Sequence, residues 1–463
     1  MTSAPYWPFI VLALGIITVV ILIARLRIHA FLALMISAVV VGILSGELPG
    51  GEGVAHILRA VELPMREFGG IAGQIAFVIA LAAIIGTAMM ESGAADKIVN
   101  SLIGVFGERN AAIALIFSSL VLAIPVFFDT VFFLLIPLAQ ALRLKTGNNY
   151  VLFVMAIGGG AAITHHLVPP TPGPLIMAET LQVDLGVTIM AGLLSAILPA
   201  IAVYYGGKAI NDRWDIPFRA PVISDINKTA QVSTADEHAW APGIMLSLLP
   251  VVLPVLLISL STIIGLSENT SMVAFSFLGN KNVAMMLGTM IAMWLWAKRK
   301  GWRMSDLGDA VGEPLQIAGI IILITCAGGA FGAMIKLAGI ADAVAWATAD
   351  FQISFILLGW ITAAVMKIAQ GSGTVAMITA SSIMYAIIGD GSALGYHPIY
   401  VLLAIGFGAM FISWMNDSGF WVVAKLGGFT EQETLKTWTV MLGLIGIVGL
   451  VQLLIMAAIF PFV

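Results

Sequence analysis

Two short polar stretches interrupt the apolar first half of the chain and carry groups that could do chemistry. The first is Phe127-Phe128-Asp129-Thr130, and the second is Thr164-His165-His166, which a proline-rich run from Pro169 to Pro174 follows. A carboxylate can carry a proton or accept hydrogen bonds from hydroxyl groups, and a histidine titrates in the physiological range. Polar, helix-breaking sequence within apolar surroundings is typical of a pathway through a membrane.

The second half of the chain contains two comparable stretches. They are Gln370-Gly371-Ser372-Gly373-Thr374 and Asn416-Asp417-Ser418-Gly419. Their hydroxyl and amide groups suit a polyhydroxylated ligand. Lys367 lies three residues before Gln370. It could contact a carboxylate of the ligand, or it could extend along the apolar surface to the outer face of the membrane.

The composition indicates an all-α polytopic membrane protein. Of the 463 residues, 60% are hydrophobic and 10% are charged, whereas a soluble domain carries roughly 25% charged residues. Apolar stretches of about 20 residues, enough to cross a bilayer as a helix, recur throughout. We expect no enzyme activity, cofactor, metal or nucleic-acid partner, because no His or acid spacing places metal ligands on one helical face.

The distribution of Lys and Arg predicts an orientation in the membrane. Basic residues follow the first apolar segment at Arg25 and Arg27, recur from Lys298 to Arg303, and occupy the long polar loop 208–240. By the positive-inside rule these regions lie in the cytoplasm. The loop 389–398 contains no Lys or Arg. We therefore expect that loop and both chain termini on the outer side.

Short matches between the two halves indicate an internal repeat. Gly86 and Gly93 recur as Gly332 and Gly339, and Tyr150-Val151-Leu152 recurs as Tyr400-Val401-Leu402. The predicted first repeat covers residues 1–207 and the second covers 241–463, with 208–240 as a cytoplasmic linker. We expect about five crossings in each half and about 10 in total, an odd number per half that requires inverted repeats.

Each half is predicted to contain a re-entrant hairpin followed by a broken helix. The hairpins are expected at about 110–143 and 354–388, and the broken helices at about 150–180 and 399–427, because polar or proline-containing sequence divides each apolar stretch there. The helix that starts after each break directs the positive end of its dipole at the gap. Four such elements meeting near the membrane centre would bind an anion.

We predict a ligand site where these interruptions meet. An ionised acid near the bilayer centre costs about 2.5 to 3.5 kcal/mol on insertion scales, so a buried acid usually has a role, although either acid could instead cap a helix. Adjacent histidines cannot face the same way on a helix, so at most one is expected to line the site. The proton-coupling candidates are Asp129, His165 and Asp417. The substrate-binding candidates are Asp129, Thr130, Thr164, His165, His166, Thr171, Gln370, Ser372, Thr374, Asn416 and Ser418.

Four motifs carry a resemblance that covers nearly the whole chain. They are FFDTVFFLLIPLA, GGGAAITHHLVPPTPGP, QGSGT and WMNDSGFW, and the pattern resembles the gluconate permease family of sugar-acid:proton symporters within the ion transporter superfamily. The resemblance implies uptake of gluconate or a related hydroxy-carboxylate with protons across a bacterial inner membrane. It also implies a homodimer whose transport domain moves against a scaffold in an elevator motion.

One departure from the family pattern leaves the substrate open. Thr171 stands where members of this family often have a histidine. The alternative is a transporter of the same fold for another small hydroxylated anion or zwitterion, such as glycerate, a short hydroxy acid or D-serine. The coupling ion is open too, because backbone carbonyls of a broken helix with Asn416, Asp417 and Ser418 could ligate sodium.

Overall fold

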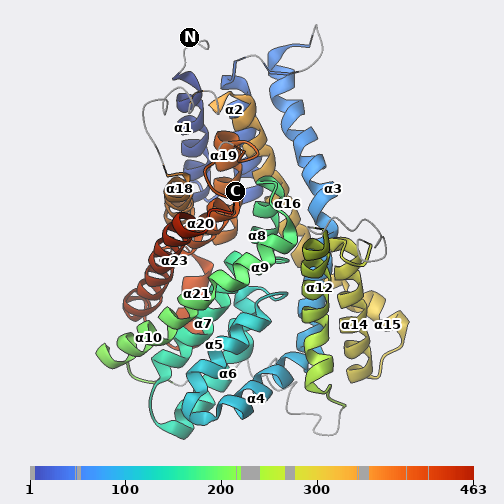
Figure 1. The fold of residues 1–463 in the computed structure, drawn as a ribbon, viewed down its shortest axis with the longest axis vertical. Helices are drawn as coiled ribbons and strands as arrows, with labels where there is room; N and C mark the ends of the chain where they lie inside the picture. The colour runs from blue at the N-terminus through green and yellow to red at the C-terminus, as the bar shows by residue number, and fades with distance from the viewer. Residues whose placement is uncertain are drawn as a thin grey trace.

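The structure is a computed structural model that describes residues 6–46, 48–49, 54–214, 216–219, 240–265, 277–340, 343, 354–392, 394–415 and 417–462. Its regular elements are all helices (Figure 1). No strand occurs within these ranges, which agrees with the predicted all-α class. Most of the predicted linker, residues 215 and 220–239, lies outside the described residues, and so does Asn416.

The described helices are divided between the two halves of the chain. The first half contains α1 (Trp7–Val20), α2 (Ala30–Leu44), α3 (His56–Glu91), α4 (Ala94–Phe106), α5 (Ala111–Leu122), α6 (Phe128–Thr146), α7 (Tyr150–Leu167), α8 (Pro172–Thr180), α9 (Leu185–Ser195) and α10 (Ile197–Arg213). The second half contains α12 (Ile244–Gly265), α14 (Lys281–Lys300), α15 (Met304–Ala310), α16 (Gly312–Leu337), α18 (Phe355–Gln370), α19 (Gly373–Ile388), α20 (Ile399–Met410), α21 (Ser418–Gly427), α22 (Glu431–Thr434) and α23 (Val440–Ile459).

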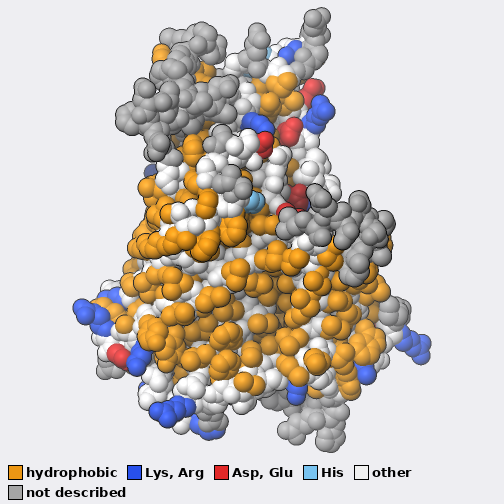
Figure 2. All heavy atoms as spheres, viewed as in Figure 1, with side chains coloured by type: hydrophobic (Ala, Val, Ile, Leu, Met, Phe, Trp, Pro, Cys, Tyr) orange, Lys and Arg blue, Asp and Glu red, His pale blue; other side chains and the backbone are white. Residues whose placement is uncertain are grey.

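The helices have the length and composition of a multi-span membrane protein. Among the described residues, six helical segments are long and apolar enough to cross a membrane: His56–Glu91, Tyr150–Thr180, Leu185–Arg213, Ile244–Ile264, Asp306–Leu337 and Glu431–Ile459. Six shorter apolar helices of 10 to 17 residues accompany them. Figure 2 shows hydrophobic side chains over much of one face, with Lys and Arg at its lower rim.

We divide the helices into two groups, which contact each other through α16 and α19 and through α12 and α9. In the first, which we call the frame, α3 packs against α16, α2 packs against α16, and α14 packs against α3 and α12; α1 joins it through α2. In the second, which we call the cavity group, α7 contacts α5, α6, α10 and α20, and α19 packs against α18. The cavity group comprises α5 to α10 and α18 to α23. The predicted inverted repeat stays a prediction.

Proline and glycine residues interrupt the helices of the cavity group. In the first half, α5 ends before Pro125 and α6 begins after the extended Phe127, since proline disfavours helical geometry in the residue before it. In the second half, α18 ends at Gly371, which has a φ of 90°, a left-handed conformation that glycine adopts without steric cost. These breaks lie inside the predicted hairpin ranges 110–143 and 354–388, although α6 continues to Thr146.

The two predicted broken helices are the pairs α7–α8 and α20–α21. Helix α7 ends at Leu167 because Val168 is extended and two prolines follow, and proline cannot donate the backbone hydrogen bond that would continue the helix. Helix α20 ends at Met410, and α21 begins eight residues later at Ser418. Helix α10 continues to Arg213, past residue 208 where the predicted linker 208–240 begins.

Candidate functional site

A cavity of about 460 Å³ lies where the four interruptions meet. The first residues of four helices line it: Phe128 of α6, Pro172 of α8, Gly373 of α19 and Ser418 of α21. The remaining described lining residues are Phe127, Asp129, Thr130, Ala162, His165, His166, Ile317, Ile321, Ile324, Lys367, Ser372, Thr374, Val375, Met410, Asp417, Gly419, Trp438 and Leu442.

The four helix N-termini differ in how their backbone N–H groups are satisfied. At α21, Oδ1 of Asp417 accepts a hydrogen bond from the Gly419 N–H at 3.0 Å. At α19, Oγ of Ser372 accepts one from the Val375 N–H at 3.3 Å. No side chain caps α6 or α8. The positive ends of these two dipoles therefore face the cavity without a capping side chain, which favours an anionic ligand.

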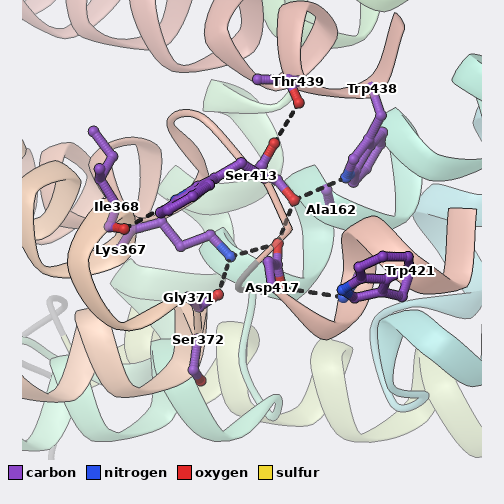
Figure 3. Close-up of polar contacts among 12 residues, drawn as sticks. Ala162, Lys367, Ile368, Gly371, Ser372, Ser413, Asp417, Trp421, Trp438 and Thr439 are labelled. Carbon is purple, nitrogen blue, oxygen red and sulfur yellow. Dashed lines mark hydrogen bonds and ion pairs between the residues drawn. The ribbon is translucent and has the colours of Figure 1, made fainter. Parts of the chain in front are cut away.

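Lys367 and Asp417 form a buried ion pair at the cavity wall (Figure 3). Nζ of Lys367 lies 2.6 Å from Oδ2 of Asp417 and donates a second hydrogen bond to the Gly371 carbonyl at 2.5 Å. The Lys367 side chain is 4% exposed. Because a buried ammonium without a partner is strongly destabilising, this contact fixes Lys367 at the wall rather than at the membrane surface.

The same carboxylate is held from a third direction. Oγ of Ser413 donates a hydrogen bond to Oδ2 of Asp417 and in turn accepts one from Nε1 of Trp438 at 3.1 Å (Figure 3). Trp438 lies in the π-helical turn Leu435–Thr439 that precedes α23. Such turns inside helices frequently occur at functional sites. The chain Trp438, Ser413, Asp417, Lys367 thus connects α23 to the tip between α18 and α19.

Asp129 has a different environment. It lies in the first turn of α6, lines the cavity and is half-buried. The charges of Asp417 and Lys367 both act on it. Within the described part of the chain, its carboxylate has neither a hydrogen bond nor an ion pair. Asp129 is therefore available to a ligand or a proton in a way that Asp417 is not.

Both histidines line the cavity, which corrects the expectation that at most one would do so. Their rings are 5.4 Å apart and inclined at 79°. Both lie in the last turn of α7, which ends at Leu167. Nδ1 of His166 lies 2.8 Å from the Ala162 carbonyl. A carbonyl only accepts, so Nδ1 carries the proton.

Two of the predicted site residues, Thr164 and Thr171, do not line the cavity, and two more are not described by the structure. Thr164 is buried and is not among the lining residues. Thr171 is also outside the lining: its hydroxyl donates to the carbonyls of His165 at 3.1 Å and Val168 at 2.7 Å, so it stabilises the break between α7 and α8. The side chain of Gln370 and the whole of Asn416 lie outside the described residues. Thr130, Ser372, Thr374 and Ser418 line the cavity, and their role in substrate binding stays a prediction.

The structure also places in the wall residues that sequence reasoning missed. Ile317, Ile321 and Ile324 of α16 line the cavity from the frame, and their spacing puts them on one helical face. Trp438 was missed because an aromatic residue in an apolar segment is ordinary. Among the described residues, no group of three or more His, Cys, Asp or Glu side chains could hold a metal ion.

The fold is similar to that of a known membrane transporter. The crystal structure of the Alcanivorax borkumensis YdaH transporter matches with a TM-score of 0.65, covering 96% of this chain and 99% of that chain at 14% sequence identity. A structural likeness at this low sequence identity shows the fold alone. The chain has the fold of an all-helical, multi-span membrane transporter.

Sequence comparisons define the family. Residues 7–459 match the GntP family of permeases. The gluconate permease of Pseudomonas aeruginosa is 32% identical over 96% of each chain. The low-affinity gluconate transporter of Escherichia coli K12 is 30% identical over 94% of this chain and 95% of that protein. The Gnt-II system L-idonate transporter of the same organism is 28% identical over 98% and 99%. The chain belongs to the GntP family of permeases and is a transporter, not an enzyme.

Proposed function

We propose that this permease takes up gluconate or a related sugar acid together with protons across a bacterial inner membrane. The observation that carries the proposal is the convergence of four helix N-termini on one cavity that contains Lys367, Asp129 and several hydroxyl groups. The helix dipoles favour the carboxylate of a ligand. The hydroxyl groups of Thr130, Ser372 and Ser418 match the hydroxyl groups of a sugar acid.

The names of the relatives support the same substrate class. Two relatives cited above are named for gluconate and one for L-idonate, and they match nearly the full length of this chain. The binding residues in this proposal are the polar lining residues Thr130, His165, His166, Ser372, Thr374 and Ser418. Asp129 is the proposed proton carrier, because Asp417 already has three hydrogen-bond partners.

The distribution of polar groups supports an elevator motion. Every titratable or hydroxyl-bearing residue in the described wall belongs to the cavity group, and the residues that the frame contributes are the three isoleucines of α16. A ligand held in this way can move with the cavity group without losing a polar contact to the frame. In this proposal the protein is a homodimer of inverted repeats with both termini outside, and the frame is the fixed scaffold.

The test is thermal stabilisation of the purified protein by a panel of ligands at pH 5.5 and pH 7.5, followed by uptake into proteoliposomes. The panel contains gluconate, L-idonate, glycerate, a short hydroxy acid and D-serine. We expect the largest shift with gluconate or L-idonate, and uptake that an inward proton gradient drives. Selective stabilisation by D-serine, or accumulation that follows sodium and ignores the proton gradient, would contradict the proposal.

A further inference from the structure

We propose that Lys367 and Asp417 form a fixed pair of opposite charges, that Asp129 alone carries the coupled proton, and that one proton therefore accompanies each monocarboxylate. This inference rests on the proposed function and adds its stoichiometry. Its positioning residues are Ser413 and Trp438, which hold the Asp417 carboxylate against the lysine.

Both carboxylate oxygens of Asp417 already accept hydrogen bonds, so the residue is unsuited to carry a proton. Its Oδ2 accepts from both Lys367 and Ser413, and its Oδ1 accepts from the Gly419 N–H at the start of α21. A proton on this carboxylate would remove a hydrogen-bond acceptor and leave the ammonium of Lys367 buried without a counter-charge.

Asp129 is the one acid of the described wall that is not in an ion pair. The described titratable groups of the wall are Lys367 from α18, His165 and His166 from α7, and Asp417 before α21. Lys367 and Asp417 cancel each other. A proton on either imidazole would place a second positive charge beside Lys367, whose charge acts on both rings. Asp129 is the remaining acid of the described wall. A proton on it would break no hydrogen bond or ion pair with a described residue.

The net charge of the cavity indicates how many protons accompany the ligand. With Asp129 ionised and the ion pair formed, the described wall carries one net negative charge. A bound monocarboxylate adds a second negative charge, and one proton on Asp129 restores the original sum. Ligand and proton therefore bind more tightly together than alone, because each offsets the charge of the other. The loaded and empty cavities carry equal charge, so transport is electroneutral.

The experiment measures the balance point of transport in proteoliposomes that contain the full chain. A gluconate gradient of about tenfold is set against pH gradients, with the membrane potential clamped at zero or at about −100 mV by potassium and valinomycin. One proton predicts zero net flux at about one opposing pH unit, with no shift on changing the potential. A balance point near half a pH unit that moves with the potential would overturn the inference, since two protons carry net charge.

This measurement separates the two proposals. If no pH gradient moves gluconate or L-idonate at all, the proposed function fails. If a proton gradient moves the substrate but the balance point depends on the potential, the proposed function stands and the single-proton inference fails.

Variants then assign the proton to a residue. Asp129→Asn is expected to abolish accumulation driven by a pH gradient while retaining gluconate counterflow, because exchange of loaded carriers needs no proton release. Asp417→Asn is expected to lose substrate-induced thermal stabilisation and counterflow together. Glu91→Gln, which removes an acid outside the cavity that pairs with Lys300 at 3.0 Å, is the matched control. Accumulation retained in Asp129→Asn, or counterflow retained in Asp417→Asn with only the pH response lost, would overturn the assignment.

Discussion

Glu179 at the end of α8 forms an ion pair with Lys281 at the start of α14, joining the cavity group to the frame. Two further contacts cross the same boundary nearby. Oγ1 of Thr262 in α12 donates to Oδ1 of Asp184 at 2.7 Å. Nζ of Lys336 in α16 donates to the Tyr385 hydroxyl at 3.1 Å, and that hydroxyl also accepts from Gln182 at 3.0 Å. The segment 179–184 therefore contacts α14 and α12 of the frame directly and reaches α16 through the Tyr385 hydroxyl.

The first prediction is that these contacts stabilise the arrangement described here relative to a displaced one. Lys281→Gln should shift the population toward the displaced arrangement by about fivefold, since a partly exposed ion pair contributes up to about 1 kcal/mol. The measurement is the distance distribution between spin labels at the exposed positions 205 on α10 and 245 on α12, in a Cys326→Ser background.

The control for this prediction is Arg219→Gln, which removes the exposed ion pair between Arg219 and Glu433. That pair does not connect the cavity group to the frame, so the distance distribution should stay as in the parent protein. An unchanged distribution in Lys281→Gln would show that the ion pair does not select this arrangement.

The second prediction concerns the contact between α16 and α19. A Cβ at Gly332 would stand 1.9 Å from Cβ of Ser382, whereas a Cβ at Gly319 on the same helix would meet nothing within 4 Å. Gly332→Ala should therefore destabilise the protein by about 1 to 3 kcal/mol through overpacking. Gly319→Ala should be neutral or stabilising by up to about 1 kcal/mol, because alanine favours a helix. Thermal unfolding in detergent measures both, and equal melting temperatures would contradict the packing described.

The third prediction separates a structural role of Thr171 from a role in selectivity. Thr171→Val keeps the shape of the side chain but removes the donor to the carbonyls of His165 and Val168. We expect a loss of stability of about 1 to 3 kcal/mol, the cost of leaving buried acceptors unpaired, with the order of preference across the ligand panel unchanged. Thr18→Val, which removes an exposed hydroxyl bond to Leu14, is the control. A changed ligand order would show that residue 171 selects the substrate.

The fourth prediction tests the positioning role of Trp438. Trp438→Phe retains an aromatic ring near Phe128, whose centroid is 5.5 Å away, but loses the hydrogen bond to Ser413. Affinity for gluconate should fall about threefold to tenfold, as expected for one hydrogen bond of about 0.5 to 1.5 kcal/mol. Trp421→Phe removes an indole N–H bond to the Met415 carbonyl outside the cavity and should change affinity less. Equal effects of the two variants would contradict the prediction.

Much of the site could be predicted because helix breaks leave a strong signal in sequence. Pro125, Pro169 and Gly371 mark interruptions by their own backbone preferences, and the structure shows helix ends at or beside all three. Polar residues at those breaks need a partner in apolar surroundings, either in a shared cavity or, as for Thr171, in a nearby backbone carbonyl.

Contacts between distant segments could not be predicted in the same way. Lys367 and Asp417 lie 50 positions apart, and the sequence between them carries no pattern that pairs them. The general cost of a buried charge required some partner for Lys367, but sequence alone did not identify which acid. The position of both histidines depended on where α7 ends relative to the cavity, which is a matter of packing. Thr171 was assigned to the ligand because its two carbonyl partners become close only after the chain turns.

The isoleucine face formed by Ile317, Ile321 and Ile324 bears on how such permeases diversify. An apolar face provides no hydrogen-bond partner, so it distinguishes little among ligands that differ in their hydroxyl groups or charge. In the proposed elevator mechanism, mutations in α6, α7, α19 or α21 would therefore change which acid is recognised while the surface past which that acid moves stays the same. Selectivity and translocation would then be physically separate traits, and selection could act on one without disturbing the other.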